Sequence, residues 1–239
     1  MKITSALLVA LAAISSTAQA ATPGNMLARL SAAAPDANPK VIELALQAHE
    51  CAIGTGVAPR ASRLAVIDYS RPSTERRMWV FDLARQTLMY DEYVAHGSGT
   101  GDNMARNFSN DDGSHQTSLG LFTTGETYVG GNGYSLRMDG LEKGINDNAR
   151  ARAIVIHGAA YVNPALARSQ GRIGRSWGCP ALRPEVAHEV IDNLKQGQML
   201  FAYYPDKNWL AKSPFLTCRT RNVAAAGGAI GNGIAARSR

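Results

Sequence analysis

Apolar side chains between residues 38 and 51 recur every three or four positions, so they share one face of a helix. They are Val41, Leu44, Ala45, Ala48 and Cys51. Gly54 follows the segment and is typical of a helix end. The pattern predicts an amphipathic helix that packs against a core.

From Arg63 onward the pattern changes to short runs rich in β-branched and aromatic residues, separated by turn formers. Such runs are typical of strands. They occupy residues 63–69, 78–83 and 87–97. Residues 84–86 are predicted to turn a hairpin between the second and third runs.

Gly, Ser, Asn and Asp crowd the region from Gly97 to Asn132, and only an extended piece at 117–124 interrupts them. We expect mainly loops here, which serve binding better than core packing.

A continuous apolar run at 153–156 ends on His157 and Gly158. Runs of this kind are usually strands buried on both faces, so His157 is expected at the rim of the core. A helix is predicted over 184–195, where Pro184 occupies the first turn, and a strand over 198–204.

The first twenty residues have the pattern of a signal peptide: a cation at Lys2, a short apolar run, and small residues at Ala18 and Ala20. No cysteine adjoins the predicted cut to accept a lipid, and no later stretch reaches the ~20 apolar residues of a membrane span. We therefore expect an exported protein of the periplasm or cell envelope, with no membrane anchor.

Four regions are predicted along the chain. They are a signal peptide at 1–20, a short helical preface at 21–60, a principal domain at 61–221 and a disordered Ala- and Gly-rich tail at 222–239.

The formal net charge of +6 suits an anionic partner. The cations are scattered rather than gathered into an aromatic-interleaved stripe, which disfavours a nucleic-acid binder. Export favours the anionic cell envelope as the partner.

Three cysteines in an oxidising compartment suggest one disulfide and one free thiol. We hypothesise that Cys51 pairs with Cys218, which would close a long loop and contribute on the order of 5 kcal/mol. Cys179 is then the free thiol. The alternative, in which Cys51 and Cys218 are inert buried thiols, is equally compatible with the sequence.

Cys179 lies between Gly178 and Pro180. A cysteine attacks as thiolate, so it needs a base or a positive field, and partial exposure. Because Pro180 steers Cys179 out of the α region, helix-dipole activation is minor, and the imidazole of His157 is the best placed base. Gly178 is expected to let a substrate carbonyl approach the backbone. Pro180 has no N–H, so oxyanion donors must be the amides of Trp177, Gly178 and Cys179.

The other histidines carry less weight. His49 and His188 lie in helical patterns and His115 lies in a polar loop, whereas His96 ends a strand and is a candidate to line the same cleft or to play a hydrogen-bonded structural role. A zinc site built from His96, His115, His157 and Cys179 is disfavoured, because no pair shows ligand spacing.

The His157–Gly158 strand end, followed by Ser-Trp-Gly-Cys-Pro-Ala at 176–181, resembles the L,D-transpeptidase (YkuD-type) catalytic domain family. The run SLGLF at 118–122 is similar to a strand of that family, and the resemblance extends over most of the principal domain. It implies a mainly β fold with a few helices, a β-sandwich or barrel, preceded here by the short helical preface.

The resemblance also implies an activity on peptidoglycan. Cys179 would attack the carbonyl of the diamino acid L-centre in a stem tetrapeptide and expel the terminal D-alanine. His157 would act as base and then acid, the Gly158 carbonyl would orient its ring, and Ser176 would stabilise the loop. An amine from a neighbouring stem would resolve the thioester, and carbapenem-type inhibitors would acylate the thiol. No metal and no organic cofactor would be needed.

Two positions depart from the familiar pattern of the family. Trp177 stands where His is usual, and Ala181 where Arg is usual. Trp177 offers the stem a hydrophobic wall or pins the loop to the core. The candidates for contacts with the substrate, including the replacement of the missing cation, are Arg137, Arg175, Arg183, Ser118 and His96.

Two further functions remain open on the sequence. An envelope cysteine peptidase or L,D-carboxypeptidase would use the same residues with water as acceptor. A noncatalytic wall-binding module would carry Cys179 as a merely buried residue.

Overall fold

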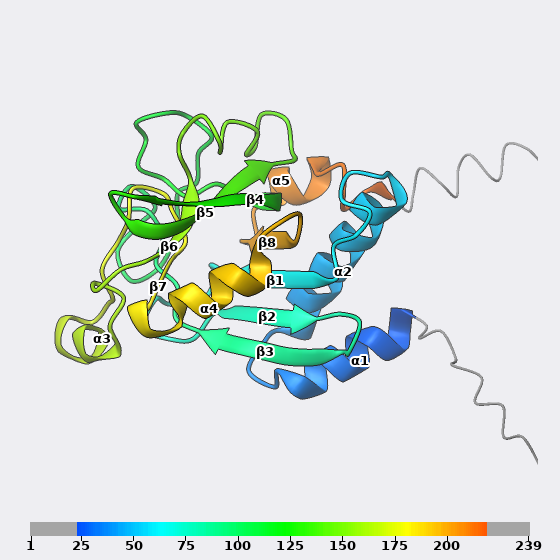
Figure 1. Cartoon of the computed structure of the whole chain (residues 1–239), viewed down its shortest axis with the longest axis horizontal. Helices are drawn as coiled ribbons and strands as arrows, with labels where there is room; N and C mark the ends of the chain where they lie inside the picture. Colours follow the sequence, from blue (N-terminus) through cyan, green and yellow to red (C-terminus); the bar gives the residue numbers. More distant parts are fainter. Residues whose placement is uncertain (1–22, 219–239) are drawn as a thin grey trace, which may run out of the picture.

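Eight strands form one sheet in the computed structural model, which describes residues 23–218 (Figure 1). The strands are β1 (Arg63–Asp68), β2 (Met78–Asp82), β3 (Thr87–Glu92), β4 (Gly120–Gly130), β5 (Gly133–Gly140), β6 (Val155–Gly158), β7 (Ala181–Leu182) and β8 (Met199–Tyr203). Their order in the sheet is β3-β2-β1-β8-β4-β5-β6-β7. The pairs β1–β8 and β6–β7 are parallel, and the others are antiparallel.

The two edges of the sheet approach each other. Beyond β3 the Ala95 amide donates a 2.9 Å hydrogen bond to the Ala181 carbonyl in β7. Arg183, just after β7, forms an ion pair with Glu92 at the end of β3, with an N–O distance of 2.7 Å. The sheet therefore curves almost into a barrel, and this closure brings the segment after β3 beside the cysteine loop.

The helices are α1 (Pro23–Ala33), α2 (Pro39–Gly54), α3 (Pro164–Gln170), α4 (Pro184–Leu194) and α5 (Lys207–Lys212). The Asn38 side chain caps α2 by accepting from the Lys40 amide. In Figure 1, α1 and α2 lie beside β1–β3, and their buried side chains belong to the same hydrophobic cluster as the strands. The helical preface is thus part of the core of the domain.

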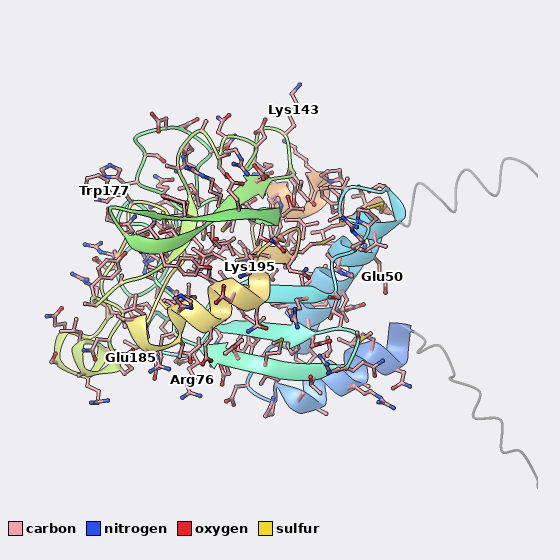
Figure 2. All side chains as sticks on the ribbon, viewed as in Figure 1. Glu50, Arg76, Lys143, Trp177, Glu185 and Lys195 are labelled. Carbon is pink, nitrogen blue, oxygen red and sulfur yellow. A yellow bond between two sulfur atoms is a disulfide. The ribbon has the colours of Figure 1, made fainter. Side chains whose placement is uncertain are left out.

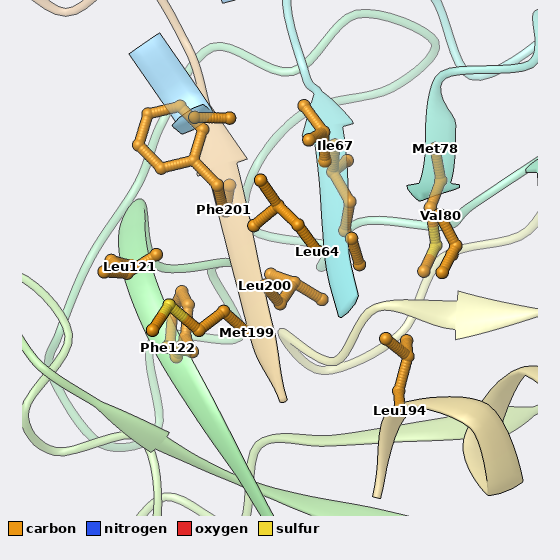
Figure 3. Close-up of a cluster of buried hydrophobic side chains, with 14 of the residues drawn as sticks. Leu64, Ile67, Met78, Val80, Leu121, Phe122, Leu194, Met199, Leu200 and Phe201 are labelled. Atoms are coloured by element: carbon orange, nitrogen blue, oxygen red, sulfur yellow. The ribbon is translucent and has the colours of Figure 1, made fainter. Parts of the chain in front are cut away.

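The centre of the sheet is apolar on both faces. In β1 and β8, Leu64 to Ile67 and Met199 to Ala202 are all buried. Their side chains meet those of β2, β4 and α4 in Figure 3. Burial on both faces explains why these strands are continuous apolar runs rather than alternating ones.

Cys51 and Cys218 form a disulfide with Cα atoms 5.9 Å apart, which confirms the hypothesised pairing. Cys179 is the free cysteine. No helix in the described part of the chain is long and apolar enough to cross a membrane. The predicted signal peptide and the tail from residue 222 lie outside residues 23–218.

Most of the predicted elements are confirmed, as is the mainly β fold with few helices. One boundary is wrong: the extended piece predicted at 117–124 begins at Gly120 and continues to Gly130 as β4, which pairs with β5 in a long hairpin. The first residues of β4 are buried and its far half is partly or fully exposed, so the alternation of apolar and polar residues that marks a half-buried strand is missing.

Candidate active site

A cavity of about 410 Å³ lies between the end of β6 and the loop that precedes β7. Its lining residues are Asn132, Arg152, Ala153, His157, Tyr161, Arg175, Ser176, Trp177 and Cys179. The lining therefore brings together five of the residues singled out in the sequence: His157, Arg175, Ser176, Trp177 and Cys179.

His157 lies on β6, where its Cα partner is Ala181 of β7. Its Nδ1 is 3.0 Å from the Gly158 carbonyl oxygen. A carbonyl can only accept, so Nδ1 carries the hydrogen and Nε2 of the neutral ring keeps its lone pair. Burial lowers the pKa of His157, an effect that the bond to Gly158 partly opposes. The ring is therefore neutral at pH 7 and able to accept a proton at Nε2.

Cys179 lies two residues before Ala181 of β7 and lines the same cavity as His157. Its thiol donates to the Ala153 carbonyl at 3.7 Å and accepts from the Val155 amide at 3.5 Å. Burial raises the pKa of Cys179, whereas the Val155 amide and the Arg152 charge lower it. The resting thiol is therefore protonated.

Ser176 closes the cysteine loop from within. Its hydroxyl donates to the Cys179 carbonyl at 2.7 Å and accepts from the Gly178 amide at 3.1 Å. The backbone of Ser176 is tied to the segment after β3, since its amide donates to the His96 carbonyl and its carbonyl accepts from the Ser98 amide. The loop is thus held at both its side chain and its backbone.

Gly178 has a different role from the one expected. Its φ is +120°, and an added Cβ would lie 2.8 Å from the Gln116 carbonyl oxygen and 2.9 Å from Ile154 Cδ1. The missing side chain therefore makes room for neighbouring protein, not for substrate. Its amide is also bonded to Ser176, so the expectation that all three amides of the loop are open oxyanion donors is wrong for Gly178.

Trp177 is 75% exposed and projects from the molecule on the side away from α2 (Figure 2). One face of its indole stacks on His115, with ring centroids 4.8 Å apart and planes within 4° of parallel. Such exposure rules out the alternative in which Trp177 pins the loop to the core. It leaves Trp177 and His115 as an aromatic wall at the rim of the cavity.

Several expected residues lie outside the cavity lining. His96 is fully buried, where Nδ1 accepts from Arg77 at 2.8 Å and Nε2 faces the Gly101 carbonyl. Burial, and then the Arg77 charge, lower its pKa to about 4. The interpretation that His96 contacts substrate is therefore wrong, and the structural alternative applies. Ser118 is buried and bonds to the Ser109 carbonyl and to Arg152.

The arginines divide in the same way. Arg137 and Arg183 do not line the cavity. Arg137 pairs with Glu126 and lies over the Tyr128 ring, and Arg183 pairs with Glu92. Arg175 does line it, but its Nη1 is 3.0 Å from Asp102.

Sequence reasoning missed four lining residues: Asn132, Arg152, Ala153 and Tyr161. Asn132 lies in the turn of the β4–β5 hairpin. The other three lie just before or just after β6, the strand that carries His157. No spacing motif marks them. The one usable signal was their position in loops beside a strand that ends on a candidate base.

A family model described as the L,D-transpeptidase catalytic domain matches residues 33–203. The chain belongs to this family. The match begins at the end of α1 and ends with β8, so it includes the cavity with His157 and Cys179. A search of curated proteins finds no match.

The solved structures to which the chain is similar share little sequence identity with it. An L,D-transpeptidase from Mycobacterium smegmatis is 16% identical with a TM-score of 0.37, over 60% of this chain and 59% of that chain. L,D-transpeptidase 3 from Mycobacterium tuberculosis, in complex with a faropenem-derived adduct, is 16% identical with a TM-score of 0.37, over 60% of both chains. One from Stackebrandtia nassauensis is 12% identical with a TM-score of 0.36, over 69% of this chain and 68% of that chain. This chain thus spans less than two thirds of the first two proteins.

Proposed function

We propose that the protein is an exported L,D-transpeptidase that acts on peptidoglycan stem peptides, with Cys179 as nucleophile and His157 as general base and acid. The observation that carries this proposal is that both side chains line one cavity, with the His157 tautomer set by Gly158. Membership of the family supports the reaction class. Export is supported by the N-terminal pattern and by the Cys51–Cys218 disulfide, since disulfides persist in oxidising compartments.

In the first step Nε2 of His157 takes the proton of the Cys179 thiol, and the sulfur attacks the carbonyl carbon of the diamino acid L-centre. The carbonyl π electrons move to its oxygen. When the tetrahedral intermediate collapses, the C–N bond to D-alanine breaks, and the imidazolium returns its proton to the departing amine. A thioester on Cys179 and free D-alanine result.

In the second step the amine of a neighbouring stem attacks the thioester. His157 removes its proton and then protonates the leaving sulfur, so the resting state is restored. Water in place of the amine gives the tripeptide, which is the L,D-carboxypeptidase outcome. The same residues serve both outcomes, and the acceptor decides between them.

The developing oxyanion needs N–H donors. Because the Gly178 amide donates to Ser176 and Pro180 has none, we assign this role to the amides of Trp177 and Cys179. The bond from Ser176 to the Cys179 carbonyl orients the peptide units around the nucleophile. The exposed Trp177 indole offers the stem an apolar wall.

The test is incubation of the purified protein with disaccharide-tetrapeptide, followed by mass analysis of the products. A transpeptidase gives cross-linked dimer, whereas a carboxypeptidase gives tripeptide without dimer; both release D-alanine. Intact mass after incubation with a carbapenem is expected to rise by one adduct, located on Cys179.

The matched variant is Cys179→Ala, which is expected to abolish both products and the adduct while retaining the fold. If the reduced wild-type protein forms no adduct and no product, the enzyme assignment fails. Binding to intact peptidoglycan that is equal in wild type and Cys179→Ala, without turnover in either, would instead identify a wall-binding module.

A further inference from the structure

The cavity contains a cation that the sequence did not single out. Arg152 lines it together with Cys179 and His157, and it lies in the turns between β5 and β6. All four Nη hydrogens have acceptors. These are the Ser109 carbonyl, the Ser118 hydroxyl, the Ser114 hydroxyl and the Gln116 carbonyl, at 2.7–3.1 Å.

All four acceptors are neutral. Among the ion pairs of residues 23–218 none includes Arg152, whereas Arg175, the other cation in the lining, is paired with Asp102. The charge of Arg152 is thus fixed in direction by its bonds and is not cancelled by a carboxylate in contact. A charge held in this way keeps its field at the thiol.

Arg152 also lies close to the cysteine loop. Its Nη2 is 3.5 Å from the position that a Cβ on Gly178 would occupy, and the Gln116 carbonyl that accepts from Nη2 is 2.8 Å from the same position. The guanidinium therefore fixes segment 109–118 against the loop and presents its charge beside the nucleophile.

We propose that Arg152 supplies the fixed positive charge that stabilises the Cys179 thiolate. This role differs from the one that the sequence suggested for Arg137, Arg175 or Arg183, which was to bind the carboxylates of the stem. The inference rests on the proposed function, because it concerns the thiolate that would attack the substrate. The Nη hydrogens of Arg152 already have acceptors, so Arg152 cannot bind a substrate carboxylate in a bidentate way unless these hydrogen bonds break. Arg152 therefore acts on Cys179 through its field, as a positioning residue.

Other charged and titratable groups lie around Arg152 and Cys179. His157, Tyr161 and Arg175 share the cavity lining. Tyr69, buried behind the site, interacts electrostatically with Cys179. From the loop, Asp111 and Asp112 act on Arg152 at longer range. Replacement of Arg152 alone leaves all these groups in the chain, so the experiment removes one charge.

The experiment measures alkylation of Cys179 by iodoacetamide as a function of pH, with no wall substrate. The thiol loses its proton, the sulfur forms a bond to the methylene carbon, and iodide leaves with the C–I electron pair. Cys51 and Cys218 are bridged and do not react. Failure of the proposed transpeptidase reaction leaves this measurement intact, so the two proposals are tested separately.

Arg152→Gln is expected to raise the apparent pKa of the thiol by about one unit, as an opposite charge nearby typically lowers it by 1–3 units. Alkylation at pH 7 then slows about tenfold. The control is Arg150→Gln, two residues away, whose side chain pairs with Glu126 and Asp139 outside the cavity; its profile is expected to match wild type. Equal profiles for Arg152→Gln and wild type would overturn the proposal.

A second pair of variants keeps Arg152 and changes only its contact with Ser114. Ser114→Asp places a carboxylate against Nη2, which now bonds to the Ser114 hydroxyl at 3.1 Å, and is expected to raise the thiol pKa. Ser114→Asn, of the same size and neutral, is expected to leave it unchanged. If Arg152→Gln does not fold, this pair decides: coincident profiles for the Asp and Asn variants would mean that the charge of Arg152 does not reach the thiol.

Discussion

The Ser176 hydroxyl donates to the Cys179 carbonyl at 2.7 Å and at the same time accepts from the Gly178 amide. One buried hydroxyl thus fixes the peptide units on both sides of the candidate nucleophile. Ser176→Ala leaves a buried amide and a buried carbonyl without these bonds. We expect a loss of about 1–3 kcal/mol in the free energy of unfolding, measured by urea denaturation.

The same variant is expected to slow carbapenem acylation of Cys179, because the loop loses its fixed geometry. Ser169→Ala, in α3, is the control, since that hydroxyl bonds only to the Leu166 carbonyl of its own helix. Wild-type acylation by Ser176→Ala would show that the backbone ties of the loop suffice.

Gly178 is expected to tolerate no side chain. Gly178→Ala combines a left-handed φ with a Cβ less than 3.0 Å from the Gln116 carbonyl, so it forces the cysteine loop away from segment 109–118. Gly144 also has a positive φ, +76°, but nothing lies within 4 Å of its Cβ position. Gly144→Ala therefore costs only the backbone strain, about 1 kcal/mol. The difference in Tm between the two variants, measured by thermal unfolding, gives the steric part of the destabilisation by Gly178→Ala. Equal shifts in Tm would contradict the packing argument.

The rate of acylation is expected to rise with pH through the pKa of His157. Burial lowers that pKa, so the acidic limb lies below the ordinary histidine value of about 6.5. Below the limb the imidazolium cannot accept the thiol proton. His157→Gln is expected to remove the limb and to reduce the rate by roughly 10²–10⁴-fold. Stopped-flow acylation by a carbapenem between pH 4 and 8 provides the measurement, and a limb that persists in the variant would assign it to another group.

Removal of the Trp177 indole is expected to affect substrate binding more than stability. Trp177 is exposed and stacks on His115, so Trp177→Ala loses little buried area. We expect KM for disaccharide-tetrapeptide to rise about threefold to tenfold, on the scale of an aromatic contact, with kcat nearly unchanged. His115→Ala, which removes the supporting ring, is expected to have a smaller effect in the same direction. A fall in kcat alone would place Trp177 in the chemistry rather than in binding.

The Cys51–Cys218 disulfide joins α2 to the end of the described chain, with 167 residues of separation. The double variant Cys51→Ser/Cys218→Ser is expected to lose about 2–5 kcal/mol of stability while the Cys179 site, on the far part of the sheet, still reacts. Non-reducing intact mass of the wild type is expected to show one free thiol. Three free thiols would contradict the bridge.

The sequence by itself indicated many of the elements and the residues that we propose carry the chemistry. Continuous apolar runs specify buried strands such as β1 and β8, because their pattern depends on local burial alone. The pairing of a lone free cysteine with a strand-ending histidine likewise follows from what the thiol needs, a neutral base. The sequence also indicated the Cys51–Cys218 pair, although inert thiols remained possible.

Only the tertiary structure decided which polar residues share the cavity. His96 ends a predicted strand as His157 does, yet closure of the sheet buries it against Arg77. Arg152 shows no motif, yet its bonds to segment 109–118 aim its charge at Cys179. Contacts between segments far apart in the chain depend on how the sheet curves and closes. Local patterns of hydrophobic and polar residues do not predict that curvature.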